Sequence, residues 1–285
     1  MAFIEHALGK THYTVRGARS EKPPIVWLHG GPGGTHNPKS RLFDLAESRQ
    51  VYAYTQMGSG KSGDLPKRRR TVATFVKELH ILIATWGLDR FHLMGGSWGA
   101  TLALEYGLRH PESGLQSLVL QSPMLSAIDW QRDAKQLIRA MSKEDQKVIR
   151  YCHDIGATDS AVYQAVMRRY YRNHVLRNDK KLDAMFSRDN PRGAAIYEHM
   201  WGPSEFVATG TLKNHDRTPH LKNVKIPTLI VCGEHDEATP ATGQRYAKRL
   251  HNGQFEMIRG ASHVIWEEQP ARLRKAINRF LAGIE

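Results

Sequence analysis

One serine stands where a short apolar segment turns sharply into a helical one. The segment that begins at Phe91 leads into Gly95-Gly96-Ser97-Trp98-Gly99, and apolar residues at helical spacing follow from Trp98. The pattern Gly-x-Ser-x-Gly is typical of a nucleophile elbow, a strained strand-to-helix turn that exposes a serine hydroxyl. Glycines on both sides let the backbone pass close to the turn. Because strand and helix patterns flank the motif in the correct order, we predict that Ser97 is a nucleophile rather than a loop residue.

A serine hydroxyl requires a base that accepts its proton and a carboxylate that orients the base. Asp236 follows the apolar segment 226–232, and His263 lies in the loop after the next predicted strand, 255–258. Both side chains are therefore expected at the sheet edge where Ser97 projects, in the chain order Ser, Asp, His. We predict that His263 is the general base and acid and that Asp236 orients it. Glu234 is the alternative acid, but it comes earlier, where its side chain is expected to point back into the fold.

A glycine-rich loop follows the buried-strand pattern of residues 24–28 and reads His29-Gly30-Gly31-Pro32-Gly33-Gly34. Such a backbone can fold closely around a reacting group. We predict that the N–H groups of Gly31 and Trp98 form an oxyanion hole, which binds the negative charge of a tetrahedral intermediate. His29 is expected to be a structural hydrogen-bonding residue beneath this loop.

The elements that must position these residues alternate between buried strands and helices. Further strand patterns occupy 11–16, 51–55 and 117–123, a helix is predicted from Thr71, and a closing helix spans 270–281. This alternation predicts a mostly parallel central sheet covered by helices on both faces. Together with the chain order Ser, Asp, His, which is that of α/β-hydrolases, it leads us to expect an α/β-hydrolase fold. Residues 124–222 show helical periodicity alone. We therefore predict a core of residues 1–123 and 223–285 and an inserted helical cap at 124–222, over the carboxyl edge of the sheet.

The composition excludes several classes of function. No apolar run is long enough to span a membrane, no signal peptide is visible, and the two cysteines suggest neither a disulfide framework nor a metal site, so a cytoplasmic location is expected. The net charge of +13 is spread along the chain, and its one dense run, 67–70, lacks interleaved aromatic residues, so no nucleic-acid partner is predicted. The glycines of 58–63 match a dinucleotide fingerprint, but no apolar helix follows them. We predict no metal and no organic cofactor.

Four segments together resemble the prolyl iminopeptidase family of α/β-hydrolases, peptidase family S33, over essentially the whole chain. They are the loop 29–33, the elbow 95–99, Gly233-Glu234-His235-Asp236-Glu237-Ala238-Thr239-Pro240 and Ser262-His263. The cap segment 197–206 looks closest to the tricorn-interacting aminopeptidases and their amino-acid-amidase relatives. The resemblance implies release of an N-terminal residue, often proline, from short peptides or amides.

The same resemblance implies how a free amine is recognised. Glu205 and Glu237 match the acidic residues that bind the substrate's α-ammonium, and Tyr197 matches a substrate-contacting tyrosine. Paired carboxylates in a pocket poor in water suit a cation. The chain departs from the family pattern at Thr55 and Met57, where the family has Asp and Arg. This departure removes an expected buried ion pair near the oxyanion loop, a loss that can be nearly neutral for stability.

The sequence leaves three functions open. The leading prediction is a serine aminopeptidase or amidase that acts on small substrates with a free α-amine. A general esterase could use the same triad, and it would be indifferent to Glu205. A catalytically silent receptor is the third alternative, but its expected sign, a broken triad or oxyanion loop, is missing. The preferred N-terminal residue and the oligomeric state stay open.

Overall fold

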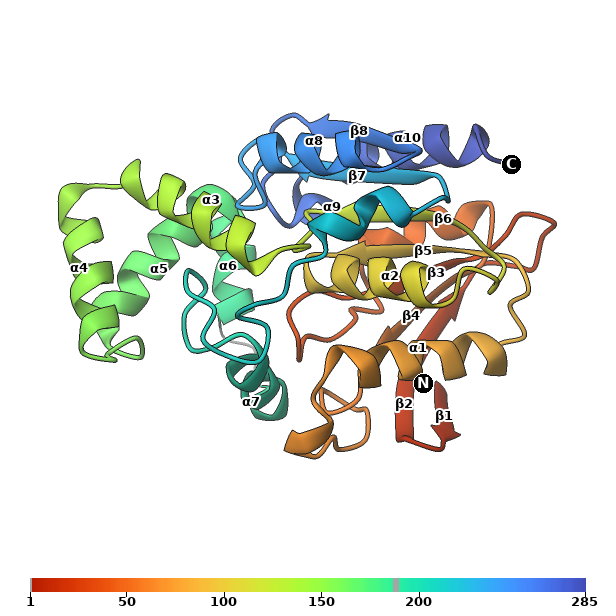
Figure 1. The fold of residues 1–285 in the computed structure, drawn as a ribbon, viewed down its shortest axis with the longest axis horizontal. Helices are drawn as coiled ribbons and strands as arrows, with labels where there is room; N and C mark the ends of the chain where they lie inside the picture. The colour runs from red at the N-terminus through yellow and green to blue at the C-terminus, as the bar shows by residue number, and fades with distance from the viewer. Residues whose placement is uncertain (1, 187–189) are drawn as a thin grey trace.

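An eight-stranded sheet runs through the centre of the protein (Figure 1). The computed structural model describes residues 2–186 and 190–285, and its strands follow the order β1-β2-β4-β3-β5-β6-β7-β8. The pairs β1–β2 and β2–β4 are antiparallel, and every other neighbouring pair is parallel. The predicted mostly parallel sheet is therefore confirmed. The strands are β1 (Ala2–His6), β2 (Gly9–Arg16), β3 (Ile25–Leu28), β4 (Val51–Thr55), β5 (Phe91–Gly96), β6 (Leu115–Gln121), β7 (Thr228–Gly233) and β8 (Gly253–Ile258).

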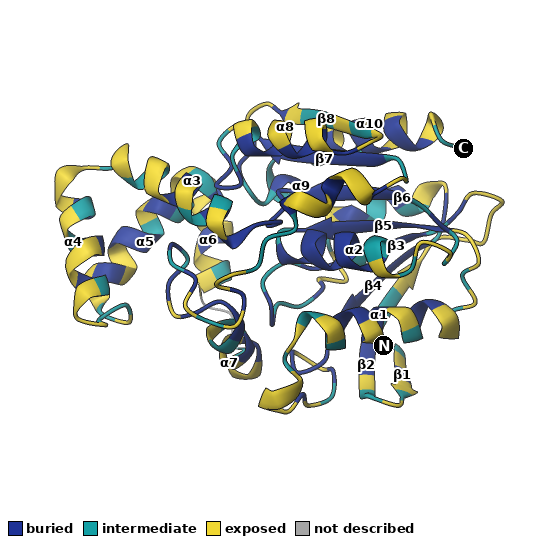
Figure 2. Cartoon of the chain, viewed as in Figure 1, coloured by how far each residue is buried: buried dark blue, intermediate teal, exposed yellow. Residues whose placement is uncertain are grey.

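Side chains of the central strands enter two separate apolar cores. In β4, Tyr52 and Tyr54 belong to one core, whereas Val51 and Ala53 belong to the other. Because side chains alternate across a strand, a sheet with apolar residues at every position must be covered on both faces. Figure 2 shows these strands buried between helices whose outer surfaces are exposed. One face is covered by α1 (Val72–Thr85), α2 (Trp98–Arg109) and α8 (Pro240–Arg249), and the other by η1 (Arg41–Glu47), α9 (Ile265–Glu268) and α10 (Pro270–Ala282).

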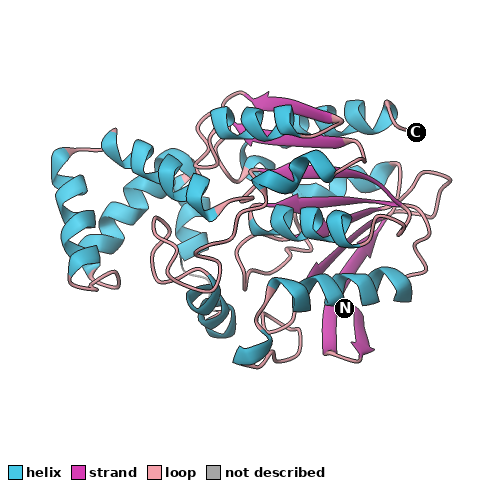
Figure 3. Ribbon diagram, viewed as in Figure 1, coloured by secondary structure: helices cyan, strands magenta, loops and turns pink. Residues whose placement is uncertain are grey.

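Five helices separate β6 from β7 and lie together at one end of the sheet (Figures 1 and 3). Three of them begin at a serine, Ser126, Ser142 or Ser160, whose hydroxyl accepts a hydrogen bond from the N–H three residues ahead. Helices α3 to α6 bury an apolar cluster of their own, with Tyr163 and Tyr170 among its largest side chains, whereas Ile196 and Met200 of α7 join the core beneath the sheet's first face. The division of the chain at residues 123 and 222 stays a prediction. The helices are α3 (Ala127–Arg139), α4 (Lys143–Asp154), α5 (Ala161–His174), α6 (Asp179–Phe186) and α7 (Pro191–Met200).

Helix α7 contacts the glycine-rich loop of the core backbone to backbone. A Cβ added to Gly33 would overlap the Gly193 carbonyl, and a Cβ added to Gly193 would overlap the Gly33 carbonyl. The side chain of Asn190, which caps α7, donates a hydrogen bond to the Gly33 carbonyl at 2.9 Å. Two residues without side chains therefore fix the distance between α7 and the loop.

Two 3-10 helices, η2 (Lys67–Arg69) and η3 (Thr218–Asn223), complete the regular structure of the described residues. None of the helices found there is long and apolar enough to cross a lipid bilayer.

The close packing of α2 against β3 predicts a large effect of one methyl group. A Cβ at Gly99 would overlap the carbonyl oxygen of Leu28, a backbone atom that cannot move aside. We expect Gly99→Ala to lower the free energy of unfolding by about 3 kcal/mol, at the upper end for overpacked sites. Gly107, in the same helix, has room for a Cβ at ordinary contact distances of 3.5–3.7 Å. Gly107→Ala should be stabilising by about 0.5–1 kcal/mol. Urea unfolding of both variants checks this, and equal stabilities would contradict the packing argument.

Candidate active site

Ser97 occupies the turn between β5 and α2 in a strained backbone conformation. Its φ of 54° and ψ of −118° lie in a region that residues with a side chain rarely adopt. The Ser97 N–H donates to the Gln121 carbonyl at 2.9 Å, which ties the turn to β6. Glycine suits position 30, because a Cβ there would lie 3.1 Å from the Cβ of Ser97, closer than an ordinary contact. The structure thus has the elbow geometry that the sequence motif predicts.

Asp236 and His263 lie in contact, as their predicted roles require. The Nδ1–H of His263 donates to Oδ1 of Asp236 at 2.8 Å. The Asp236 carboxylate is itself held by three further donors, the Ser122 hydroxyl at 2.6 Å and the N–H groups of Gly233 and Ala238. A carboxylate fixed in this way can orient an imidazole and keep its Nε2 free for proton transfer.

Ser97 and His263 line one cavity of about 420 Å³. Within the described residues the Ser97 hydroxyl has no hydrogen-bond partner, so Ser97 and His263 share the cavity without a hydrogen bond between them. Catalytic hydrogen bonds are often long in ligand-free proteins and tighten when substrate binds. The edge of the Trp130 ring packs on His263, with centroids 5.8 Å apart, and helps to hold the imidazole in place.

The two residues whose amides are predicted to form the oxyanion hole both lie beside Ser97. Gly31 and Trp98 line the same small cavity as Ser97, with a volume of about 30 Å³. In the described part of the chain neither N–H donates to a protein acceptor. The Trp98 N–H is also the first of α2, where the helix dipole favours negative charge. Both groups are therefore available to an oxyanion.

His29 lies beneath the loop and is locked by hydrogen bonds. Its Nε2 accepts from the Gln56 N–H at 3.0 Å, and its Nδ1 donates to the Gly30 carbonyl at 3.0 Å. Burial lowers the pKa of His29 to about 4, against a small opposing effect of the Gly30 hydrogen bond. This neutral, fully engaged imidazole fits the structural role that the sequence predicts.

Glu205 lies in the same small cavity as Ser97, together with Tyr197. Its Oε2 accepts hydrogen bonds from the hydroxyls of Tyr197 at 2.7 Å and of Tyr171 at 3.0 Å. Burial, followed by the charge of Glu205, raises the pKa of both tyrosines well above the usual value, so they stay protonated donors. Tyr197 thus orients the carboxylate, and its ring lies over Gly31, 4.0 Å from where a Cβ would be.

Glu237 is buried between the cap and His263. It is 5% exposed, its Oε1 lies 3.9 Å from Nδ1 of His263, and its Oε2 has no hydrogen-bond partner. Burial, followed by the charge of Glu205, holds the pKa of Glu237 well above its usual value. A buried carboxylate oxygen with no donor is costly, and a cationic ligand would satisfy it.

His263 is surrounded by negative charge. Burial by itself would lower its pKa, but the charge and hydrogen bond of Asp236 act in the opposite direction, and Glu237 and Glu205 add to them. The balance raises the pKa of His263 to about 9. The free protein therefore favours a protonated imidazole at neutral pH.

Glu234, the alternative acid, does not point into the fold as its position suggested. Its side chain is 42% exposed, and its carboxylate accepts from the Gly260 N–H at 2.8 Å. The prediction of its direction is wrong because the chain turns after β7 and places this residue on the surface loop. It has no contact with His263 in the structure.

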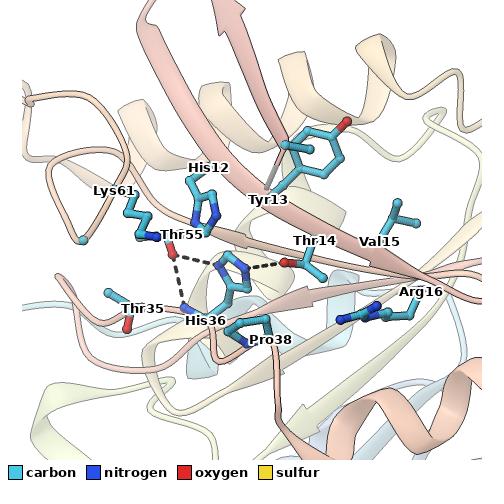
Figure 4. Close-up of a pocket in the computed structure, with 12 residues that line it drawn as sticks. His12, Tyr13, Thr14, Val15, Arg16, Thr35, His36, Pro38, Thr55 and Lys61 are labelled. Atoms are coloured by element: carbon cyan, nitrogen blue, oxygen red, sulfur yellow. Dashed lines mark hydrogen bonds between the residues drawn. The ribbon is translucent and has the colours of Figure 1, made fainter.

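The departure from the family pattern at Thr55 and Met57 is accommodated without an ion pair. The Thr55 hydroxyl bonds Nδ1 of His36 at 2.8 Å, and Nε2 of His36 bonds Thr14 (Figure 4). The Met57 N–H donates to the buried carboxylate of Glu78 at 3.1 Å, and no cation lies within ion-pair distance of that carboxylate among the residues described. Burial raises the pKa of Glu78 to about 7, although hydrogen bonds oppose the shift. The cavity in Figure 4 contains none of the predicted site residues.

Three residues of the site were missed by sequence reasoning. Ser122 holds Asp236, Tyr171 holds Glu205, and Trp130 packs on His263. Ser122 directly follows β6 with a φ of 47°, but the sequence carries no motif that signals this conformation. The described residues contain no group of three His, Cys, Asp or Glu side chains placed to hold a metal ion.

Comparisons with known proteins identify the family of this chain. Residues 23–270 match the family model described as alpha/beta hydrolase fold. The chain is 35% identical over 285 residues to a proline iminopeptidase from Heyndrickxia coagulans, covering 99% of this chain and 98% of that protein. It is 32% identical over 277 residues to the proline iminopeptidase of Lactobacillus delbrueckii subsp. bulgaricus, covering 95% and 94%.

Two solved structures resemble this one closely. The crystal structure of VinJ superposes with a TM-score of 0.93 at 31% identity, covering 100% of this chain and 98% of that one. The crystal structure of a Mycobacterium smegmatis proline iminopeptidase gives a TM-score of 0.88 at 29% identity, covering 99% and 98%. Together with the family match, these likenesses identify a hydrolase. The chain belongs to the α/β-hydrolase family and, within it, to the family of the proline iminopeptidases.

Proposed function

We propose that this protein is a serine aminopeptidase that releases the N-terminal residue from short peptides or amino-acid amides. Ser97 is the nucleophile, His263 the general base and acid, and Asp236 the residue that orients His263. The curated relatives, named proline iminopeptidases, support proline as one N-terminal residue to test. The two buried, unbridged cysteines suit a cytoplasmic enzyme.

The observation that carries this proposal is the position of Ser97 between two cavities. The small cavity holds Glu205, Tyr197 and the two free amides, and the larger one holds His263. An acyl group on the first side would have its ammonium near Glu205 and its carbonyl oxygen near Gly31. The leaving amine would then lie on the second side, beside the residue that must protonate it.

The proposed reaction follows from the placement of the acyl group in one cavity and the leaving amine in the other. The Ser97 hydroxyl attacks the carbonyl carbon while Nε2 of His263 takes its proton, and the oxyanion accepts hydrogen bonds from the N–H groups of Gly31 and Trp98. His263 then gives the proton to the leaving nitrogen, the C–N bond breaks, and an ester of Ser97 remains. His263 then takes a proton from water, which attacks that ester. The bond to the Ser97 oxygen breaks, His263 returns the proton to this oxygen, and the free amino acid is released.

Recognition of the free amine limits the enzyme to the end of a chain. The unpartnered oxygen of Glu237 and the carboxylate of Glu205 would accept hydrogen bonds from the α-ammonium. An internal peptide bond has an amide in place of this ammonium, so it would leave Glu237 unsatisfied. Exopeptidase action thus follows from the charge of the site.

A comparison of free and blocked substrates tests the proposal. We expect cleavage of the p-nitroanilides of proline, alanine or phenylalanine, and a loss of at least about a hundredfold in kcat/KM when their amines are acetylated. The p-nitroanilide with the highest kcat/KM shows the preferred residue. Equal cleavage of blocked anilides, or cleavage of p-nitrophenyl acetate alone, would instead identify a general esterase.

A further inference from the structure

The base of the proposed reaction is surrounded by acids from two loops. His263 contacts Asp236 at 2.8 Å and Glu237 at 3.9 Å, both from the loop after β7. Glu205, from the loop after α7, also acts on His263 through its charge. His263 is therefore the positive partner of a cluster of three carboxylates.

No other cation shares this cluster. Among the residues that the structure describes, neither Glu205 nor Glu237 forms an ion pair with a lysine or arginine. The small cavity beside Ser97 is lined by no basic side chain. Glu205 lines this cavity, and its charge acts on both Glu237 and His263. A positive charge that enters the cavity therefore competes with the proton on His263 for the field of these carboxylates.

We propose that the α-ammonium of the substrate displaces a proton from the His263–Glu237 pair, so that recognition of the amine also frees His263 to act as a base. This inference rests on the proposed function and assigns Glu237 a second role, as a positioning residue for that proton. Binding of the amine therefore also activates the base. When a molecule without the amine binds, His263 keeps its extra proton and cannot accept one from Ser97.

The other groups that face His263 do not supply the same charge. The backbone N–H of His263 donates to the backbone carbonyl of His174, the last residue of α5. Burial lowers the pKa of the His174 imidazole. Burial also raises the pKa of Tyr170 in the same helix, so its hydroxyl stays protonated. From the loop after β6, the Ser122 hydroxyl donates to the His263 carbonyl at 3.2 Å. From α3, Trp130 presents an apolar ring. Among the groups around His263, the carboxylates raise its proton affinity against the opposing effect of burial, and the His263–Glu237 pair titrates as a unit.

The proton balance of the step is simple. Without substrate, the pair of His263 and Glu237 holds one proton beyond the Nδ1–H that Asp236 accepts. The ammonium brings one positive charge between Glu205 and Glu237, and the extra proton leaves to solvent. Nε2 of His263 then has a free lone pair with which to accept the proton of the Ser97 hydroxyl.

Replacement of Glu237 by glutamine separates the two roles of this residue. We expect Glu237→Gln to lower kcat/KM for proline p-nitroanilide but to raise kcat/KM for p-nitrophenyl acetate about tenfold at pH 7, because one unit of pKa is a tenfold change in neutral imidazole. For the ester, kcat/KM should rise with pH through the pKa of His263, and the midpoint should move down by about one unit in the variant.

Glu234→Gln is the matched control, because Glu234 lies in the same loop but is exposed, with the Gly260 N–H and His235 as its neighbours among the described residues. It should leave both substrates and the pH profile unchanged. If Glu237→Gln leaves the ester profile unchanged or lowers ester hydrolysis, the inference is wrong. If Ser97→Ala still cleaves the anilide, the proposed function itself fails.

A binding measurement does not depend on the folding of the Glu237 variant. Prolinamide is titrated into Ser97→Ala by calorimetry at pH 7.5 in two buffers that differ in ionisation enthalpy. Release of about one proton per bound amine is expected. Binding without proton release overturns the inference.

Discussion

Replacement of Ser97 by alanine is expected to lower kcat for aminoacyl anilides by about a millionfold, the loss found when the nucleophile of a Ser–His–Asp triad is removed. The proposed acyl-enzyme cannot form without the hydroxyl, whereas the amides of Gly31 and Trp98 and the carboxylates of Glu205 and Glu237, proposed to bind the oxyanion and the amine, stay in place. Binding should therefore survive: prolinamide should bind the variant as tightly as it inhibits the wild type. Steady-state kinetics at high enzyme concentration and calorimetry measure the two quantities.

Ser59→Ala is a suitable control for Ser97→Ala. Ser59 is another buried serine, and its hydroxyl has no hydrogen-bond partner. Its removal should leave activity within a factor of about two, because no interaction is lost. Residual activity of Ser97→Ala above one part in a thousand would mean that another group attacks the substrate.

Replacement of Glu205 by glutamine is expected to lower kcat/KM for free-amine substrates by about a hundredfold, through the loss of a charged hydrogen bond. The effect has a second cause in the structure. Tyr197 and Tyr171 both donate to Oε2, so the amide oxygen of a glutamine would take this place and its NH2 group, which only donates, would face the ammonium. N-acetylated substrates and p-nitrophenyl acetate should change by less than about threefold, since they have no ammonium.

Glu198→Gln provides the comparison for Glu205→Gln. Glu198 is an exposed carboxylate of α7 that lines a different cavity from Ser97. Its replacement should alter neither class of substrate. If Glu205→Gln weakened ester hydrolysis as much as anilide hydrolysis, Glu205 would be a structural residue of the cap and not an amine ligand.

The elements that carry the site were predictable because each depends on local sequence. The elbow at Ser97 requires glycines at fixed spacing, and the apolar segments before Asp236 and His263 define the strands that end beside it. By contrast, β1 and α8 were not predicted. Helix α8 has few apolar residues, so its periodicity is weak. Its clearest sequence signal is Thr239 as N-cap followed by Pro240 at the first helical position.

Contacts between distant segments were beyond sequence reasoning. The hydrogen bond from Ser122 to Asp236 joins residues 114 positions apart, and neither residue type signals it. The predicted direction of the Glu234 side chain was wrong for a similar reason. The conformation of the loop after β7 sets this direction, and the alternation of side chains along the strand does not extend into the loop. For Glu205 and Glu237 the resemblance supplied the residues, but only the structure shows how close Glu237 lies to His263.

The backbone contact between Gly33 and Gly193 constrains the engineering of this enzyme. The cap and the oxyanion loop are adjusted to one another at a point where any side chain would separate them. A chimaera that takes its cap from a relative must therefore have glycine at the positions of both Gly33 and Gly193. Otherwise the graft would push the loop, and with it Gly31, away from the reacting carbonyl. A grafted cap would therefore change the substrate range and the reaction rate at the same time.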